Sequence, residues 1–216
     1  MKSVRLLTAS KYIKGYNFLA DCGTDHAKLP IFCVENKLVK KAFASDNKIG
    51  PIENAKKSID KANLNDLVFP ILADGLSYLH KDIDVVSVLG MGGRLIIQIL
   101  ENADLTFVKR LILSANSENY LLRQYLQDNS WKIEYEELIK ENSKYYQLMV
   151  LSQGKMDLSE LEKEFGPLII KEKSSEFIEM INKLLMKLKY GYNKAKTEEV
   201  KIEIKKRIKL LEEVIS

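Results

Sequence analysis

Short apolar segments that alternate with helix-like segments restrict the possible folds of this chain more than any other feature of its sequence. Five such segments are rich in Val, Ile, Leu and Phe, and most end at Gly, Asp or Asn; they read NFLADC, KAFASD, LVFPILAD, DVVSVLG and RLILSAN. Helix-like segments follow the first, second, fourth and fifth of them, at residues 29–37, 51–62, 93–102 and 119–127. Strands that alternate with helices are typical of βαβ units, which form a parallel sheet buried on both faces.

Two further candidate strands, residues 132–140 and 145–152, follow without a helix between them. The polar turn Glu141-Asn142-Ser143-Lys144 separates them, so they can pair antiparallel at a sheet edge. We therefore predict an α/β domain over residues 1–155, with a mostly parallel seven-stranded sheet and an antiparallel edge.

The pattern changes after residue 155. Phe165-Gly166-Pro167 interrupts the chain, and the apolar residues beyond it recur at helical spacing. We predict that residues 156–216 form a helical, coiled-coil-like hairpin. An apolar stripe of this kind is more often a packing seam than a surface for a partner. The two stripes consist of Phe177, Ile181, Leu184 and Leu188, and of Val200, Ile204, Ile208, Leu211 and Ile215.

Composition narrows the class of protein. No apolar run approaches the roughly 20 residues that cross a bilayer, and the basic N-terminal segment lacks the long apolar stretch of a signal peptide. The two cysteines, Cys22 and Cys33, have no second pair to complete a zinc site or a disulfide framework. We expect free thiols in a cytoplasmic protein that holds no metal and contacts no membrane. The oligomeric state stays open, with a monomer as the simplest expectation.

The net charge of +4 is too small to indicate nucleic-acid binding by itself, but the charge is unevenly placed. The first twenty residues carry Lys2, Arg5, Lys11 and Lys14 and no acidic residue, and residues 183–209 hold ten basic residues against three glutamates. Both ends could contact phosphates, although a solvated helix face explains many lysines equally well.

An acidic residue and a glycine close the first predicted strand, in Asp21-Cys22-Gly23-Thr24-Asp25-His26. Glycine lets the backbone approach a ligand closely at the carboxyl end of a parallel sheet, although a purely structural turn explains such a motif about as well. A second glycine is missing from this segment, so the motif is not G-x-G-x-x-G, which counts against NAD and FAD. A cofactor with an amino-acid group needs fewer glycines at this turn than a pyrophosphate does. Its ammonium could bind Asp21 or Asp25.

Three more strand ends carry comparable residues. Asp46 closes the second strand, near the spacing at which a carboxylate binds ribose hydroxyls, although it could instead cap the next helix. Asp74-Gly75 ends the third strand, where it could hold an adenine. The fourth strand runs into Gly90-Met91-Gly92-Gly93, which predicts a loop that a substrate or a methyl group can reach.

The segments DCGTDHAKLP, SDNKIGPIENAKK, LADGL and VLGMGGRLIIQIL resemble the bacterial tRNA (adenine-N1)-methyltransferases that modify the adenine at position 22. LRQYLQDNSWKIEYEELIKENSKYYQLMVL resembles the closing sheet segment of that family, and the tail is similar in kind to its helical extension. The resemblance implies a Rossmann-like class I methyltransferase that uses S-adenosylmethionine and acts on tRNA.

The resemblance also implies roles for the residues at the strand ends. Asp21, Gly23, Asp25 and His26 would line the methionine end of the cofactor; Asp46 and Asn47 would lie at its ribose, Asp74 and Gly75 at its adenine, and Gly90, Met91 and Gly92 beside its methyl group. The chain departs from the family at Lys28, where an aromatic residue is expected, and at Ser114-Ala115-Asn116, where Gln-Pro-Asn is usual. Both departures bear on the base that is modified.

Asp25 and His26 are the candidate catalytic residues. The ring nitrogen N1 of adenine has a lone pair, so no side chain needs to remove a proton from it, and Asp25 could stabilise the positive charge that methylation creates. His26 could position the base, or it could only order its loop. Two other functions remain open: a catalytically silent RNA-binding relative and a nicotinamide-dependent oxidoreductase.

Overall fold

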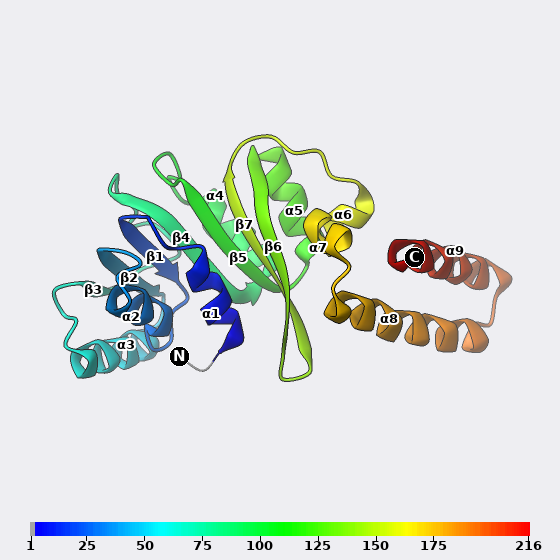
Figure 1. Cartoon of the computed structure of the whole chain (residues 1–216), viewed down its shortest axis with the longest axis horizontal. Helices are drawn as coiled ribbons and strands as arrows, with labels where there is room; N and C mark the ends of the chain where they lie inside the picture. The colour runs from blue at the N-terminus through cyan, green and yellow to red at the C-terminus, as the bar shows by residue number, and fades with distance from the viewer. Residues whose placement is uncertain (1–2) are drawn as a thin grey trace.

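The central sheet contains the seven strands that the sequence predicts. The computed structural model describes residues 3–216 (Figure 1). Strands β1 to β5 are parallel, whereas β7 lies antiparallel between β5 and β6, so the order is β3-β2-β1-β4-β5-β7-β6. This confirms the mostly parallel sheet with an antiparallel edge. The strands are β1 (Phe18–Cys22), β2 (Lys41–Asp46), β3 (Val68–Leu72), β4 (Ile83–Gly92), β5 (Arg110–Ser117), β6 (Trp131–Glu141) and β7 (Lys144–Gln153).

Helices cover both faces of the sheet, as two separate apolar clusters show. One cluster joins the strands to α1 (Val4–Lys11), α2 (Lys28–Glu35) and α3 (Ile49–Ala62). The other joins them to α4 (Gly93–Glu101) and α5 (Asn119–Asp128). The chain reverses its direction across the sheet between β1 and β4, and ligands of open α/β sheets bind at the carboxyl ends of the strands at such a point.

Helix α1 was not predicted, and a distant residue stabilises it. The Glu141 carboxylate, at the end of β6, accepts hydrogen bonds from the Val4 amide (2.6 Å) and the Ser3 hydroxyl (3.3 Å). A negative charge at a helix N-terminus is favourable because the free amides there carry partial positive charge. This contact fixes α1 on the sheet next to the carboxyl ends of the strands.

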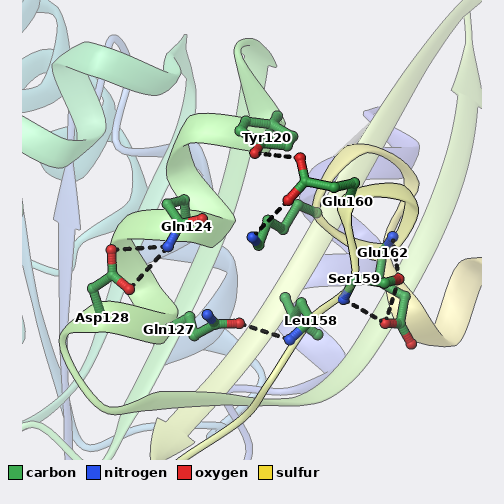
Figure 2. A network of polar contacts seen from close by, with 9 residues as sticks. Tyr120, Gln124, Gln127, Asp128, Leu158, Ser159, Glu160 and Glu162 are labelled. Carbon is green, nitrogen blue, oxygen red and sulfur yellow. Dashed lines mark hydrogen bonds and ion pairs between the residues drawn. The ribbon is translucent and has the colours of Figure 1, made fainter.

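Two short helices, α6 (Glu160–Phe165) and α7 (Pro167–Glu172), attach to α5 and β6. Figure 2 shows the first attachment: the Tyr120 hydroxyl donates to Glu160 at 2.7 Å, and the Leu158 amide donates to the Gln127 side chain at 2.7 Å. Ser159 and Glu162 form a capping box that starts α6. The chain after β7 is thus tied back to the sheet before the long helices begin.

A fully buried ion pair fixes the turn between α6 and α7. Arg123 donates to Glu136 at 2.7 Å and to the Lys163 carbonyl at 3.0 Å, while Glu136 accepts from the Leu168 amide at 3.0 Å. The cation therefore lies at the end of α6 and the anion at the start of α7, as the helix dipoles favour. Gly166 separates the two helices, and a Cβ there would lie 2.5 Å from a Glu136 oxygen.

The predicted helical hairpin is formed by α8 (Ser175–Lys194) and α9 (Glu198–Ile215), which extend away from the sheet (Figure 1). Phe177 and Ile181 are buried in the seam as predicted. Val200, which the stripe also included, is exposed, because the outer end of a two-helix hairpin has no third element to cover it. The division of the chain after residue 155 stays a prediction, since α6 and α7 contact both the sheet and the apolar cluster of the hairpin.

Within residues 3–216, none of the helices combines the length and the apolar character that a membrane crossing requires. Over the same residues, His, Cys, Asp and Glu side chains do not gather in groups of three or more that could hold a metal ion.

Candidate functional site

The carboxyl ends of β1, β2, β3 and β4 meet at one rim of the sheet. Strand pairing aligns Cys22 with Ser45 on one side and with Val88 on the other. The amides of Gly23 and Thr24 both donate to the Ser45 carbonyl at 2.9 Å, so the chain turns sharply as it leaves β1. This turn directs the segment from Gly23 to His26 over the rim.

Asp21 lies buried near the end of β1. Its carboxylate accepts a hydrogen bond of 2.6 Å from the Ser87 hydroxyl of β4. Burial raises the pKa of Asp21 to about 6, although hydrogen bonds from Ser87 and Thr24 act in the opposite direction. A carboxylate held in this way would be stabilised by any cation that entered the rim.

Gly23 brings the β1 turn against the end of β4. Its φ of +83° is in the left-handed region, and a Cβ at this position would overlap the Met91 methyl carbon. Both the backbone conformation of the turn and the contact with Met91 therefore require a residue without a side chain at this position.

The acidic residues of β2 and β3 lie further along the same rim. Asp46 accepts from the Lys48 amide at 2.9 Å, which shapes the loop before α3, and no side chain caps that helix. Asn47 and Asp74 are exposed, and Gly75 packs against Ile99 of α4.

The aspartates of the rim affect the pKa of a buried thiol, Cys22. Burial and, after it, the Asp21 carboxylate raise the pKa of Cys22 to about 12, with smaller contributions from Asp46 and Asp74. Strand pairing places Asp21 and Asp46 at the carboxyl ends of the neighbouring strands β1 and β2, and Asp74 follows the end of β3.

The glycine segment after β4 differs from the expected loop. Gly90, Met91 and Gly92 are the last residues of β4, which pairs with β5 through Met91 and Ala115, and α4 begins directly at Gly93. Pairing with β5 continues to Gly92 and Ser117, and the Asn116 side chain of β5 donates to the Gly90 carbonyl at 2.5 Å. The expected separate loop is therefore the paired end of β4, and the accessibility of this segment to a substrate or a methyl group stays a prediction.

A cavity of about 170 Å³ opens at the β1 turn. Asp25 and His26 lie at its edge as an exposed pair, with His26 Nε2 3.2 Å from Asp25 Oδ2. Lys28 lines it as well. The complete lining is Arg5, Leu6, Asp21, Cys22, Gly23, Thr24, Asp25, His26, Lys28, Leu29 and Leu89. Asp46 and Asp74 lie outside this cavity, along the open continuation of the rim.

Sequence reasoning missed the places of Arg5 and Ser87 in this region and the contact that Asn116 makes there. Arg5 was assigned only to a basic terminal segment, yet it lines the cavity. Ser87 and Asn116 hold Asp21 and Gly90 in place. A serine inside the otherwise apolar run DVVSVLG was the available signal for Ser87. Lys2, which the sequence analysis also assigned to the basic N-terminal segment, lies outside the described residues.

Comparisons with known proteins agree on one family. The family model for tRNA (adenine(22)-N(1))-methyltransferase matches residues 19–213. A tRNA (adenine(22)-N(1))-methyltransferase from Bacillus subtilis (strain 168) is 32% identical, over 99% of this chain and 96% of its own. The crystal structure of the B. subtilis M1A22 tRNA methyltransferase TrmK has a TM-score of 0.85 at 30% identity and covers 100% of this chain and 99% of that one. The structure of M. capricolum TrmK with S-adenosyl-homocysteine has a TM-score of 0.88 at 32% identity, covering 100% and 98%.

Proposed function

This chain belongs to the tRNA (adenine(22)-N(1))-methyltransferase family, and on that premise we propose that it transfers a methyl group from S-adenosylmethionine to N1 of adenine 22 in tRNA. The observation that carries the proposal is the meeting of four strand ends at one rim, where Gly23 lies against Met91 and where Asp21, Asp46 and Asp74 lie at or just after the ends of neighbouring strands.

The residues at the rim fit S-adenosylmethionine. The cavity at the β1 turn combines carboxylates with a backbone that has no side chain at Gly23, which suits the ammonium and the close approach of an amino-acid group. When bound, S-adenosylmethionine supplies a methyl group on a positively charged sulfur. We assign Asp21, Gly23, Asp25 and His26 to its methionine end, Asp46 and Asn47 to its ribose, Asp74 and Gly75 to its adenine, and Gly90, Met91 and Gly92 to the neighbourhood of its methyl group.

Alignment and charge stabilisation are the tasks left to the protein, because N1 of adenine attacks with its own lone pair. Methylation leaves a cationic base. We propose that Asp25, exposed at the cavity edge, stabilises this charge and that its partner His26 positions the base.

The tRNA would be held by phosphate contacts from the basic N-terminal segment and from the lysines of α8 and α9. We propose that removing the tail weakens tRNA binding and spares cofactor binding. The enzyme would act in the cytoplasm, as a monomer.

The test is methyl transfer from labelled S-adenosylmethionine to bulk tRNA, followed by nucleoside analysis. We expect the label in 1-methyladenosine, and its loss from a tRNA transcript in which adenine 22 is replaced by guanine. Label in another nucleoside, or in the substituted transcript, would refute the assignment.

One departure favours a second candidate, a silent RNA-binding relative. Ser114-Ala115-Asn116 replaces the usual Gln-Pro-Asn, and the buried Ser114 hydroxyl has no hydrogen-bond partner among the described residues. Such a protein would bind tRNA in the same assay and incorporate no label. A thermal-shift comparison of S-adenosylmethionine with NAD would separate both candidates from an oxidoreductase.

A further inference from the structure

A pocket larger than the one at the β1 turn lies between the sheet and the hairpin. Its volume is about 590 Å³, which is within the range of small-molecule sites. Its walls come from the start of α5, from β7, from the end of α6 and from α8. The residues assigned above to the cofactor do not line it. We call it the α5–α8 pocket.

Much of the surface of the α5–α8 pocket consists of aromatic and apolar side chains. They are Tyr120, Tyr145, Phe165, Met180 and Leu184. Figure 2 shows the ring of Tyr120 at the start of α5, where its hydroxyl donates to α6. Unpaired bases of RNA stack on aromatic side chains, and every base has a flat face for this contact. The walls of the pocket therefore suit a flat heterocycle.

Two amide side chains that line the pocket each carry a buried oxygen without a hydrogen-bond donor among the described residues. These oxygens are Asn119 Oδ1 and Gln147 Oε1. The Gln147 side chain is only 9% exposed, and its Nε2 donates to the Glu164 carbonyl at 3.4 Å. Leaving a buried acceptor without a donor is unfavourable, and a ligand with N–H groups removes this cost. The last torsion of an amide side chain is soft, so these oxygens can turn toward such a ligand.

The charges around the pocket favour a neutral group that is attached to an anion. Both carboxylates of the lining are already paired, Glu118 with Arg94 at 2.6 Å and Glu164 with Arg207. Lys187 is exposed, and none of the ion pairs formed among residues 3–216 includes it. A nucleotide has a neutral base and a phosphate, which match the amide oxygens and this lysine.

The pocket begins next to the functional rim, on the β5 side of β4. Glu118 follows directly on Ser117, which pairs with Gly92 at the end of β4. The two segments are in close contact, because a Cβ on Gly93 would lie 2.6 Å from the Glu118 carbonyl oxygen. The residues assigned to the cofactor come from β1 to β4 and the turns after them. An RNA whose adenine reaches the end of β4 can therefore place another nucleotide in the pocket.

We propose that the α5–α8 pocket binds an unpaired nucleotide of the tRNA other than the adenine that is methylated. The base lies against the apolar walls and donates its amino group to the oxygens of Asn119 and Gln147, and Lys187 contacts its phosphate. Adenine, guanine and cytosine carry an amino group, whereas uracil does not. Phosphate contacts carry no sequence information, so this pocket gives the hairpin side of the protein a part in base recognition. The inference rests on the proposed function, because it concerns the same tRNA.

The first test replaces the buried acceptor. Gln147→Met keeps the length of the side chain and removes the amide. In methyl transfer by the full-length chain to a tRNA transcript, KM for tRNA should rise about 5- to 20-fold, because the base loses one buried hydrogen bond, while kcat should change by less than about twofold. The melting temperature of the free protein should stay within about 2 °C, because this oxygen has no partner to lose. A merely structural role of Gln147 would lower the melting temperature and leave KM unchanged.

The second test separates the ring of Tyr145 from its hydroxyl, which accepts from Lys183 at 3.1 Å. Tyr145→Ala should raise KM for tRNA about 5- to 100-fold, as expected for the loss of a base contact, and Tyr145→Phe should stay within about threefold of the unaltered protein. Equal losses in the two variants would mean that Tyr145 acts only through Lys183. Phe107→Ala is the matched control, because Phe107 is 52% exposed and precedes β5 at the opposite end of that strand, and it should leave KM unchanged.

The third test identifies the nucleotide. Transcripts in which one unpaired nucleotide other than adenine 22 is replaced by uridine are compared with both the unaltered protein and Gln147→Met. One transcript should raise KM for the unaltered protein by about the same factor as Gln147→Met does, and should cause no further loss in that variant, because both changes remove the same contact.

Two outcomes would overturn the proposal. If every replaced transcript added its full effect to that of Gln147→Met, the pocket would not hold a base. If Lys187→Gln weakened tRNA binding while Gln147→Met and Tyr145→Ala did not, the hairpin would contact only phosphates. If the unaltered protein methylated no tRNA, the proposed function would fail, and filter binding of tRNA to the same variants would still test the pocket.

Discussion

Replacing Asp21 with asparagine should change how the stability of the protein depends on pH. The pKa of Asp21 is raised from 3.8 to about 6 by burial, so the folded protein keeps this proton over a range in which the unfolded chain has lost it. Unfolding then releases a proton between about pH 4 and pH 6, and the stability contribution of Asp21 falls as the pH rises through this window. A shift of about two units corresponds to about 3 kcal/mol.

Asp21→Asn removes this titration and keeps an oxygen that accepts from Ser87, whose hydroxyl lies 2.6 Å from the carboxylate. We therefore expect the free energy of unfolding of the variant, relative to the unaltered protein, to increase by about 2.5 kcal/mol between pH 4 and pH 7.5. Urea unfolding at several pH values measures this difference, and the titrations of all other groups cancel in it. Parallel curves for the two proteins would refute the reasoning.

The same carboxylate should link cofactor binding to pH. A cationic ammonium near Asp21 favours the ionised form, so S-adenosylhomocysteine binding to the unaltered protein should weaken about fivefold from pH 6 to pH 5. The affinity of Asp21→Asn should be lower and flat over that range. A variant with the original affinity and the original pH profile would remove Asp21 from the site.

Three further predictions test the turn, the buried ion pair and the lysines. Gly23→Ala, which strains a φ of +83° and displaces Met91, should lower S-adenosylhomocysteine affinity in calorimetry. Gly15→Ala is the control for backbone strain alone, because Gly15 has a φ of +97° and no neighbour within 4 Å, and it should leave this affinity unchanged. Arg123→Ala leaves Glu136 buried without its partner and should cost about 3 to 5 kcal/mol in urea unfolding, whereas a loss below about 1 kcal/mol would contradict the role of the pair. The third prediction concerns three exposed lysines of the hairpin, Lys187, Lys205 and Lys206. Replacing them by glutamine should reduce the slope of log K for tRNA binding against log salt concentration by about one unit for each phosphate that a lysine no longer neutralises. An equal slope in both proteins would show that these lysines only face solvent.

The sheet could be predicted because the information for it is local. Each apolar run has the length of a strand, and the two edge strands follow each other without a helix. Helix α1 could not be predicted in this way. It has eight residues, and its N-terminus is held by Glu141, whose carboxylate lies 137 positions further along the chain than Val4. Helices this short are marginal without tertiary contacts.

The residues of the candidate site also differ in whether local sequence or tertiary packing determines their positions. Residues that close a strand, such as Asp21 and Asp46, could be identified because the carboxyl ends of parallel strands meet at one edge. Arg5 and Asn116 could not, because their places depend on how α1 and the end of β5 pack against β4. The expected separate glycine loop is the paired end of β4 for the same reason, since the pairing that extends β4 comes from another strand.

Asn116 connects the Ser114-Ala115-Asn116 segment of β5 to two other parts of the rim. Its side chain donates from Nδ2 to the Gly90 carbonyl at 2.5 Å and accepts at Oδ1 from Arg5 at 3.5 Å. An amide can do both at once, whereas a carboxylate cannot donate and an apolar side chain can do neither. This one residue therefore joins α1 to the end of β4 through its side chain. The same physical link makes the Arg5 guanidinium and the end of β4 one unit, although they are far apart in the sequence.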